Sequence, residues 1–229
     1  MATEQYLDFS TVLASSVHDM KNSLSMLLNT IEDIAQECDP DACAAAEKLT
    51  LLQYEGQRVN NHLIQMLSIY KIENAQYTAN MGEHCVADFL EEAALLHEPL
   101  LTPKGITIET MCDPDLMGFF DREIVAGVIN NVVNNAYRYS KDRIRLSSNV
   151  VDEYIVISIE DNGEGYPKSM LGKNTSIFTN DTGQLGSTGL GLYFSSLVAN
   201  IHKNKEKSGF IRCTNEGIDG GGRFDFYFP

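Results

Sequence analysis

The chain has 229 residues, of which 43 % are hydrophobic, and it carries a formal net charge of −15 at pH 7. This length suffices for one large domain or two small ones, each with a buried core. Nucleic acid and anionic membranes are poor partners for so acidic a chain, because both attract basic surfaces. The net charge does not exclude a nucleotide, which can bind through magnesium and local backbone donors.

Neither a membrane segment nor a disulfide framework is expected. No apolar run approaches the roughly 20 residues that a membrane-spanning helix needs, and the N-terminus has no basic segment or cleavage-like site. The five cysteines are scattered and include no CxxC pair, which argues against both disulfides and a zinc site. We therefore expect a cytoplasmic protein with reduced cysteines.

The first segment, to about residue 37, has an apolar seam at helical spacing. Apolar residues recur at steps of three and four from residue 6 to residue 34, which predicts a long amphipathic helix. His18 lies next to a seam position, so its ring should stand at the edge of the stripe or in water. Asp19 follows it, and Asn22 lies one turn further on the same face. A neutral imidazole placed in this way can act as a nucleophile if Asp19 accepts the proton of its other nitrogen; a solvated surface histidine is the simpler interpretation of this segment alone.

A second helix should follow after a short turn. Asp39 is an N-cap candidate, and Pro40 suits the first helical position. The apolar seam of this helix consists of Leu49, Leu52, Gly56, Val59, Leu63, Met66 and Tyr70. A hairpin of two such helices cannot cover its own apolar stripe, and the usual solution is a dimeric four-helix bundle. We predict a homodimerizing helical hairpin over residues 1–76; packing of the hairpin on the rest of a monomer is the alternative.

The remainder, residues 77–229, has the pattern of a second domain. Residues 73–82 are polar and are predicted to be a linker. The following pattern predicts helices and strands in alternation: helices over residues 88–101, 122–139 and 192–201, and strands over residues 106–110, 143–146, 154–160, 210–213 and 223–228. Strands at hairpin spacing with helices between them indicate an α/β sandwich with helices on one face of the sheet. The whole chain is thus predicted to be of the α+β class.

The end of the predicted helix 122–139 is rich in polar residues. Asn131 and Asn135 are four apart, so both amides should project from one face. Arg138 and Tyr139 follow in the last turn. Asparagine oxygens are suitable magnesium ligands and an arginine suits a phosphate.

A second polar cluster, Asp161 to Gly165, directly follows a predicted strand. A carboxylate at a strand end, followed by Gly163 and Gly165, can accept a hydrogen bond from an exocyclic amine in a pocket. A simple turn of the Asp-x-Gly kind is the alternative.

A third cluster, Gly186 to Leu192, opens the next predicted helix. Its alternate glycines leave backbone N–H groups free to face an anion, and the N-terminus of a helix adds roughly half a positive charge. The segment is therefore a candidate phosphate site. It lacks the lysine of a Walker loop and the spacing of a dinucleotide-binding motif.

Together and in this order, the segments resemble the sensor histidine kinase family: a dimerization and histidine-phosphotransfer hairpin followed by an ATP-binding catalytic domain of the GHKL type, with a Bergerat-type fold. His18 to Asn22 resembles the H-box and Asn131 to Ser140 the N-box. Asp161 to Gly165 and Ser187 to Leu192 resemble the two glycine boxes, and the terminal strand ending at Pro229 is also similar. Ser23, Arg138 and Ser187 differ from the proline, lysine and glycine that the family usually has there.

The resemblance implies a role for each matching residue. His18 would be the phosphoacceptor, and Asp19 would be the base that activates it. Asn22 would orient water or the phosphoryl group during dephosphorylation. Asp161 would bind the adenine amine, and Asn135 would hold Mg²⁺. ATP would be bound by Asn131, Asn135, Arg138, Tyr139, Asp161, Gly163, Gly165, Thr188, Gly189, Leu190 and Gly191.

The implied function is that of a two-component histidine kinase. It would autophosphorylate His18 with ATP, pass the phosphoryl group to an aspartate of a separate response regulator receiver domain, and also act as its phosphatase. Its input would come through the short N-terminal segment or through a separate sensory partner. One alternative is a dimeric phosphotransfer scaffold whose nucleotide domain binds but does not catalyse. Another is a related ATP-binding serine kinase or anti-sigma protein, which leaves the hairpin with His18 unexplained.

Overall fold

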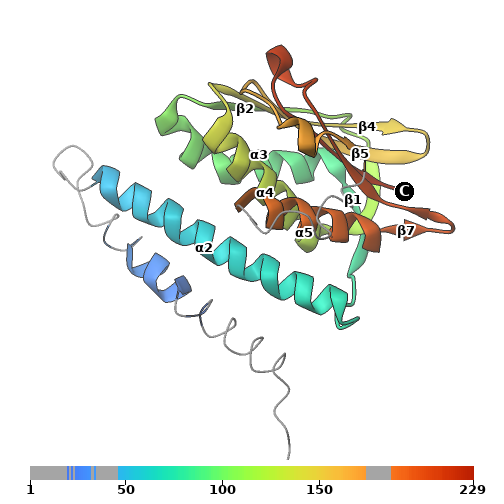
Figure 1. Cartoon of the computed structure of the whole chain (residues 1–229), viewed down its shortest axis with the longest axis horizontal. Helices are drawn as coiled ribbons and strands as arrows, with labels where there is room; N and C mark the ends of the chain where they lie inside the picture. Colours follow the sequence, from blue (N-terminus) through green and yellow to red (C-terminus); the bar gives the residue numbers. More distant parts are fainter. Residues whose placement is uncertain (1–19, 21, 23, 32–33, 35–45, 174–186) are drawn as a thin grey trace, which may run out of the picture. The chain divides into compact units, whose positions relative to one another are not determined.

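The computed structural model describes residues 20, 22, 24–31, 34, 46–173 and 187–229. The chain divides into two units, Met1–Tyr77 and Thr78–Pro229, and each is described by itself (Figure 1). His18, Asp19 and the predicted cap of the second helix at Asp39 lie outside the described residues.

The described part of the first unit is helical up to Glu73. Residues 24–31 are helical, and helix α2 extends over Ala46–Glu73. A Cβ atom at Gly56 would lie 2.6 Å from Cδ2 of Leu28, so glycine at this position lets the two helical segments approach closely. Within the described parts of the chain, no helix is long and apolar enough to cross a membrane. The four-helix bundle stays a prediction.

The second unit contains a six-stranded mixed sheet in the order β2-β4-β5-β10-β9-β6. Strands β2 and β4 are parallel, and every other neighbouring pair is antiparallel. The strand bounds, in sheet order, are β2 (Thr107–Met111), β4 (Arg143–Val151), β5 (Tyr154–Asp161), β10 (Arg223–Phe228), β9 (Phe210–Thr214) and β6 (Gly172–Lys173). The predicted hairpin of strands at residues 143–146 and 154–160 is therefore confirmed, with longer strands.

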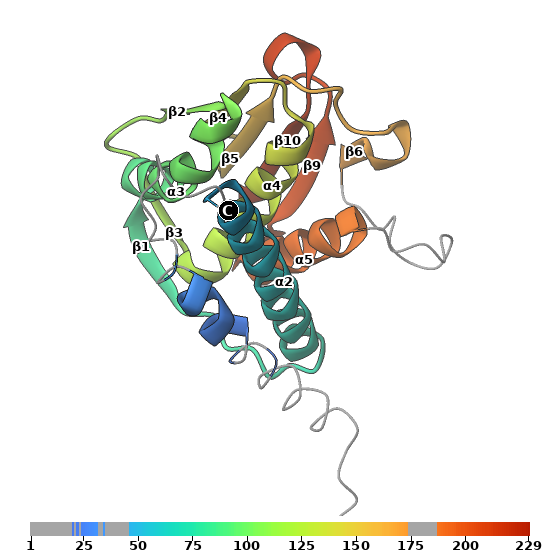
Figure 2. The ribbon, with the colours of Figure 1, turned by 90° about the vertical axis from the view of Figure 1, so that its left-hand side faces the viewer.

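Three helices lie on one side of this sheet (Figures 1 and 2). They are α3 (Val86–Leu101), α4 (Arg122–Tyr139) and α5 (Ser187–Ile201). The core lies between the helices and the sheet, and its strand residues alternate along the chain as a pleated strand requires. Fully buried members include Val125, Val128, Ile129, Ile144, Leu146, Ile157, Leu192, Phe194, Val198, Phe224, Phe226 and Phe228.

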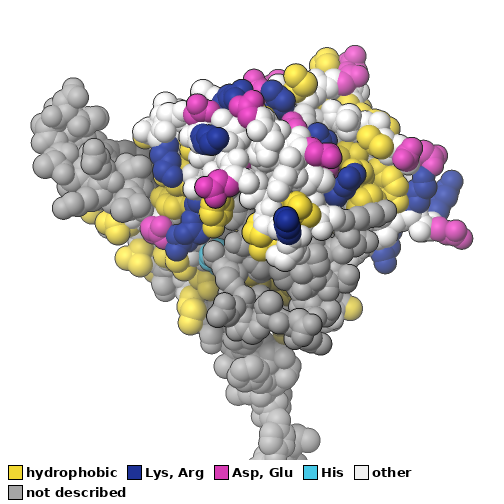
Figure 3. Space-filling model, turned by 45° about the horizontal axis from the view of Figure 1, so that its top comes forward, with side chains coloured by type: hydrophobic (Ala, Val, Ile, Leu, Met, Phe, Trp, Pro, Cys, Tyr) yellow, Lys and Arg dark blue, Asp and Glu magenta, His cyan; other side chains and the backbone are white. Residues whose placement is uncertain are grey.

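The opposite face of the sheet carries polar ion pairs beside an aromatic group that includes Phe210 and Tyr227. Arg145 pairs with Glu109, and Arg223 pairs with Glu160 and with the buried Asp225. Acidic and basic side chains are interspersed over the surface of the unit that Figure 3 shows. The excess of acidic residues is therefore not gathered into one patch on that face.

The start of α4 is held by a buried group of polar contacts. Asp121 caps the helix, because its Oδ1 accepts the backbone N–H of Ile124 at 3.3 Å. Its Oδ2 accepts the N–H of Asn80 at 2.7 Å, and its own N–H donates to Nε2 of His202 at 3.1 Å. Burial lowers the pKa of His202, which favours the neutral ring that can accept this bond. The helix that carries the predicted N-box is thus anchored at its first turn.

Some elements differ from the sequence prediction. Strands β1 (Met81–Cys85) and β3 (Met117–Asp121) pair with each other outside the main sheet, so residues 81 and 82 belong to a strand rather than to the predicted linker. Helix α5 begins at Ser187 rather than Leu192. The remaining short elements are β7 (Lys203–Asn204), β8 (Lys207–Ser208), η1 (Thr102–Lys104), η2 (Lys168–Met170) and η4 (Ile218–Gly220).

Candidate functional site

A cavity of about 500 Å³ lies at the C-terminal end of α4. Three segments that are far apart in the sequence form it: the end of α4 with the turn that follows it, the segment that follows β5, and Gly222 just before β10. Its lining consists of Asn135, Ala136, Arg138, Tyr139, Lys141, Asp161, Gly163, Glu164, Gly165, Tyr166, Pro167, Met170 and Gly222. The structure therefore brings together most of the N-box and first glycine box residues that the sequence predicted.

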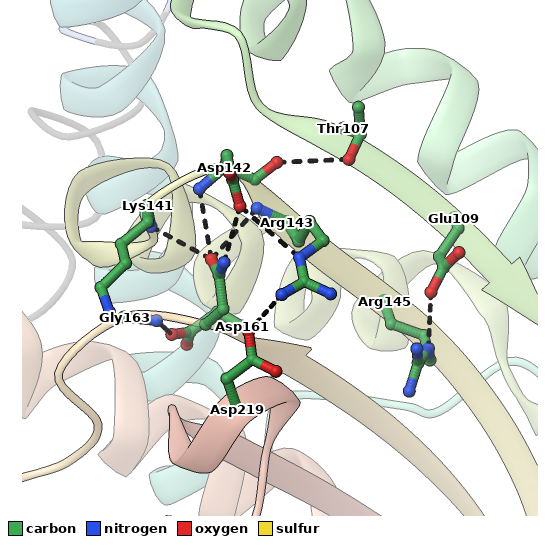
Figure 4. A network of polar contacts seen from close by, with 10 residues as sticks. Thr107, Glu109, Lys141, Asp142, Arg143, Arg145, Asp161, Gly163 and Asp219 are labelled. Atoms are coloured by element: carbon green, nitrogen blue, oxygen red, sulfur yellow. Dashed lines mark hydrogen bonds and ion pairs between the residues drawn. The ribbon is translucent and has the colours of Figure 1, made fainter.

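The carboxylate of Asp161 has a fixed orientation at the end of β5. Its Oδ1 accepts backbone N–H groups from Gly163 at 2.7 Å (Figure 4) and from Gly222 at 3.4 Å. The backbone N–H of Asp161 also donates to the carbonyl of Gly222 at 2.9 Å. Both side-chain contacts reach Oδ1, so Oδ2 has no hydrogen-bond donor among the described residues. Oδ2 is the atom that a ligand's donor can use.

Burial raises the pKa of Asp161, and the two backbone N–H groups partly oppose this effect. The ionised form is therefore less stabilised than in water. A ligand that donates a hydrogen bond to Oδ2 would favour the ionised carboxylate.

Two glycines shape the loop after Asp161. A Cβ atom at Gly163 would lie 2.2 Å from the carbonyl oxygen of Tyr139, a contact that no larger residue can make. Gly165 has a φ of 80°, in the left-handed region that favours glycine. The loop can follow this path beside the end of α4 because both positions are glycine.

Tyr166 also lines the cavity, although the sequence did not predict it as a site residue, and a distant asparagine holds its backbone in place. The backbone N–H of Tyr166 donates to Oδ1 of Asn215 at 2.7 Å, and Nδ2 of Asn215 donates back to the carbonyl of Tyr166 at 3.0 Å. Burial raises the pKa of Tyr166 well above its usual value, so the phenol stays neutral. The two residues are far apart in the sequence, so no local pattern could have identified them.

The two N-box asparagines have different surroundings. Asn135 lines the cavity. Asn131 is buried, and a Cβ atom at Gly191 would lie 2.3 Å from its Oδ1, so its amide lies directly against helix α5. Nδ2 of Asn131 has no hydrogen-bond partner within the described part of the chain. The side chain of Asn135 thus borders the cavity, whereas that of Asn131 lies against α5 at Gly191.

The remaining predicted site residues do not line the cavity or are not among the described residues. Thr188, Gly189 and Leu190 lie in the first turn of α5, where backbone N–H groups lack helical partners. Asn22 is an exposed residue of the first unit. His18 and Asp19 lie outside the described residues.

The donor chemistry around the cavity fits a magnesium nucleotide. Among the described residues, no group of three or more His, Cys, Asp or Glu side chains is arranged to hold a metal ion. Mg²⁺ commonly takes only one or two protein oxygens together with substrate phosphates. The amide oxygen of Asn135 is suitable as such a ligand.

Residues 120–229 match the family described as histidine kinase-, DNA gyrase B-, and HSP90-like ATPase. The matched segment contains every residue that lines the cavity. Residues 120–229 make up most of the second unit, Thr78–Pro229, which is thus similar to a histidine kinase-like ATPase domain. The cavity lies inside the matched segment.

Curated relatives extend the similarity beyond the ATPase domain. The sensor protein PhoQ of Escherichia coli K12 is 25 % identical over 231 residues, which cover 98 % of this chain and 44 % of PhoQ. The virulence sensor histidine kinase PhoQ of Salmonella typhimurium LT2 is 24 % identical over 185 residues, or 81 % of this chain and 36 % of the relative. The chain thus spans less than half the length of the curated relatives it matches. The resemblance to the sensor histidine kinase family that the sequence predicted is confirmed.

Solved structures show the same fold. The Acinetobacter baumannii histidine kinase AdeS matches with a TM-score of 0.60 and 21 % identity, covering 92 % of this chain and 96 % of AdeS. Full-length ShkA, solved in complex with AMPPNP, gives a TM-score of 0.65 and 19 % identity over 95 % of this chain and 45 % of ShkA. The catalytic domain of histidine kinase ThkA matches 66 % of this chain and 97 % of its own, with a TM-score of 0.55 and 22 % identity.

Proposed function

We propose that this chain is the kinase part of a two-component system, which binds ATP with Mg²⁺ and phosphorylates itself on His18. The observation that carries the proposal is the cavity beside Asp161, where backbone N–H groups hold one carboxylate oxygen and no described residue donates to the other. This cavity lies in an ATPase domain of the type found in histidine kinases.

The cavity residues support distinct roles in nucleotide binding. Oδ2 of Asp161 would accept a hydrogen bond from the adenine amine, and Gly163 and Gly165 would keep the space beside it open. Tyr139 would contact the nucleotide, and Arg138 would lie near its phosphates. Asn135 would hold Mg²⁺, which neutralises phosphate charge when bound.

The start of α5 supports a role at the phosphates. The free backbone N–H groups of its first turn and the helix dipole favour an anion. Asn131 lies against this helix at Gly191 and would fix its position relative to α4. The residues assigned to this part of the nucleotide site are Asn131, Thr188, Gly189, Leu190 and Gly191.

The H-box resemblance supports the phosphoryl step. A neutral ring nitrogen of His18 would attack the terminal phosphorus of ATP, the bond to the bridging oxygen would break, and ADP would leave. Asp19 would take the proton from the other ring nitrogen. The phosphoryl group would then pass to an aspartate of a response regulator receiver domain. In the separate phosphatase function, Asn22 would orient a water molecule that attacks the phosphoryl group on the regulator's aspartate, releasing inorganic phosphate. We further propose cytoplasmic action and a separate sensory partner.

Exposed apolar residues support a homodimer. In the first unit, two rows of apolar side chains at seven-residue spacing are 43–60 % exposed: Met20, Leu27 and Ile34, and on α2 Leu52, Val59 and Met66. Rows with this spacing form the seams of helical bundles. A second copy of the chain would cover them in a four-helix bundle.

Labelling with ATP that carries radioactive phosphorus at the γ position tests the proposal. We expect an acid-labile, base-stable phosphoprotein, and we expect His18→Gln to abolish the label while ATP still binds. Label that persists in His18→Gln would show that the phosphoacceptor is another residue. ATP binding without any label on the unsubstituted chain would instead favour the scaffold alternative.

A further inference from the structure

The residue after Asp161 ties the two sides of the cavity together. Asn162 is buried, with 4 % of its surface exposed. Its Oδ1 accepts three successive backbone N–H groups, those of residues 141–143, at 3.1–3.2 Å. Its Nδ2 donates to Oδ1 of Asp142 at 2.6 Å. One side chain thus holds the whole turn that follows α4, which Figure 4 shows at Lys141, Asp142 and Arg143.

This turn borders one wall of the cavity. Arg138, Tyr139 and Lys141 line that wall, and Asp161 and Gly163 line the adjoining one, where Gly163 packs against the carbonyl of Tyr139. Asn162 stands between Asp161 and Gly163 in the chain, so its hydrogen bonds fix how the two walls lie relative to each other.

Further contacts extend the network behind the cavity. The carbonyl of Asp142 accepts the backbone N–H of Thr107 at 2.8 Å. Arg143 forms an ion pair with Asp219 of η4 (Figure 4), and the chain after η4 returns to Asp161 at Gly222. The turn is therefore linked to β2 and to η4, the segment that leads into β10.

We propose that Asn162 is a positioning residue for the nucleotide, which acts through the turn at residues 141–143 without touching the ligand. This inference rests on the proposed ATP-binding function and deepens it. The amide group is required because Asn162 must accept with its oxygen and donate with its nitrogen at the same time. An aspartate would keep the acceptor but would place a second carboxylate against Asp142, so the two would repel each other.

The test exchanges the amide of Asn162 and the carboxylate of Asp142, which are the donor and the acceptor of their hydrogen bond. Asn162→Asp should weaken ATP binding about tenfold, measured calorimetrically with Mg²⁺ on the full chain. The double variant Asn162→Asp with Asp142→Asn restores a donor facing an acceptor, and its ATP affinity should return to within about threefold of the parent. Asn149→Asp makes the same chemical change at an exposed position of β4 and should bind ATP like the parent.

The thermal unfolding midpoint of each variant accompanies the binding measurement. The inference is wrong if Asn162→Asp binds ATP as tightly as the parent. It is also wrong if the double variant unfolds at the parent's temperature yet binds ATP as weakly as the single variant. If Asn162→Asp does not fold, the ATP affinity and the unfolding midpoint of the double variant still test the inference. Failure of the unsubstituted chain to bind ATP would overturn the proposed function itself, whereas normal binding by Asn162→Asp overturns only the positioning role.

Discussion

The ATPase domain and the helical unit differ in the contacts that their side chains make. In the first, polar groups around the cavity are hydrogen-bonded; in the second, apolar side chains are exposed to solvent. Around the cavity, the polar groups bond to one another within one chain, as Asp161 does with Gly163 and Gly222. In the helical unit, two rows of apolar side chains stay exposed. The polar contacts that shape the cavity thus lie within one chain, whereas the helical rows have a surface that a second chain would cover. Substitutions in the two regions should fail in different ways.

The largest effect is expected at the carboxylate. Asp161→Asn keeps an oxygen for the backbone N–H groups but turns an NH₂ group toward the adenine amine. Loss of a hydrogen bond to a charged group, together with an unmatched donor, should weaken ATP binding about 100-fold, as calorimetry would measure. The oligomeric state should stay that of the parent. Asp152→Asn, in the exposed turn between β4 and β5, is the matched control and should bind ATP normally.

A substitution in the helical unit is expected to change the oligomeric state and to leave ATP binding unchanged. Val59→Glu places a charge in the middle of the exposed row on α2, so the dimer should dissociate to monomers while ATP still binds. Sedimentation or light scattering measures the mass. Gln57→Glu adds the same charge about 200° away around the helix and should leave the dimer intact. If both variants stay dimeric, the row on α2 is not the interface.

A pair of glycine substitutions tests how closely the cavity wall is packed. Gly163→Ala would bring a Cβ atom to 2.2 Å from the carbonyl of Tyr139, which should cost about 1–3 kcal/mol of unfolding free energy. Gly127→Ala adds the same methyl group inside α4 at ordinary contact distance, 3.4 Å from Phe194. It should raise stability by about 0.5–1 kcal/mol through helix propensity. Denaturant unfolding of the two variants should therefore shift in opposite directions.

Much of this architecture could be predicted from the sequence. The bounds of α4 agree with the prediction of a helix over residues 122–139, because its apolar spacing is regular and Asp121 supplies a cap. The strand that ends at Asp161 was also recognisable from its alternation. The ATP-binding roles assigned to these residues stay proposals.

Other features depend on contacts between distant segments. β1 and β3 are short and lack a run of β-branched residues, and their mutual pairing makes them strands. The contacts of Asn162 with the turn after α4, and those of Asn215 with Tyr166, have no local sequence signal. The different surroundings of Asn131 and Asn135 arise from the packing of α5 against α4, which helical spacing alone cannot reveal.

The smallest effect concerns pH. Because burial raises the pKa of Asp161, this carboxyl takes up a proton at higher pH in the folded chain than in the unfolded one. It therefore favours the folded state as the pH falls, but it loses its ability to accept the adenine amine. The preference for ATP over inosine triphosphate, which has the same phosphates but an oxygen in place of the amine, should accordingly decline as the pH falls through this raised pKa. Competition binding across the pH range measures the ratio; a ratio that stays constant down to the range of an ordinary aspartate would contradict the burial of the ligand-binding oxygen.

The same pair of nucleotides at neutral pH tests the central claim most directly. If Oδ2 of Asp161 accepts the adenine amine, calorimetric titration should show ATP binding at least about tenfold more tightly than inosine triphosphate. Asp161→Asn should remove most of this preference. Equal affinity of the unsubstituted chain for the two nucleotides would contradict the account.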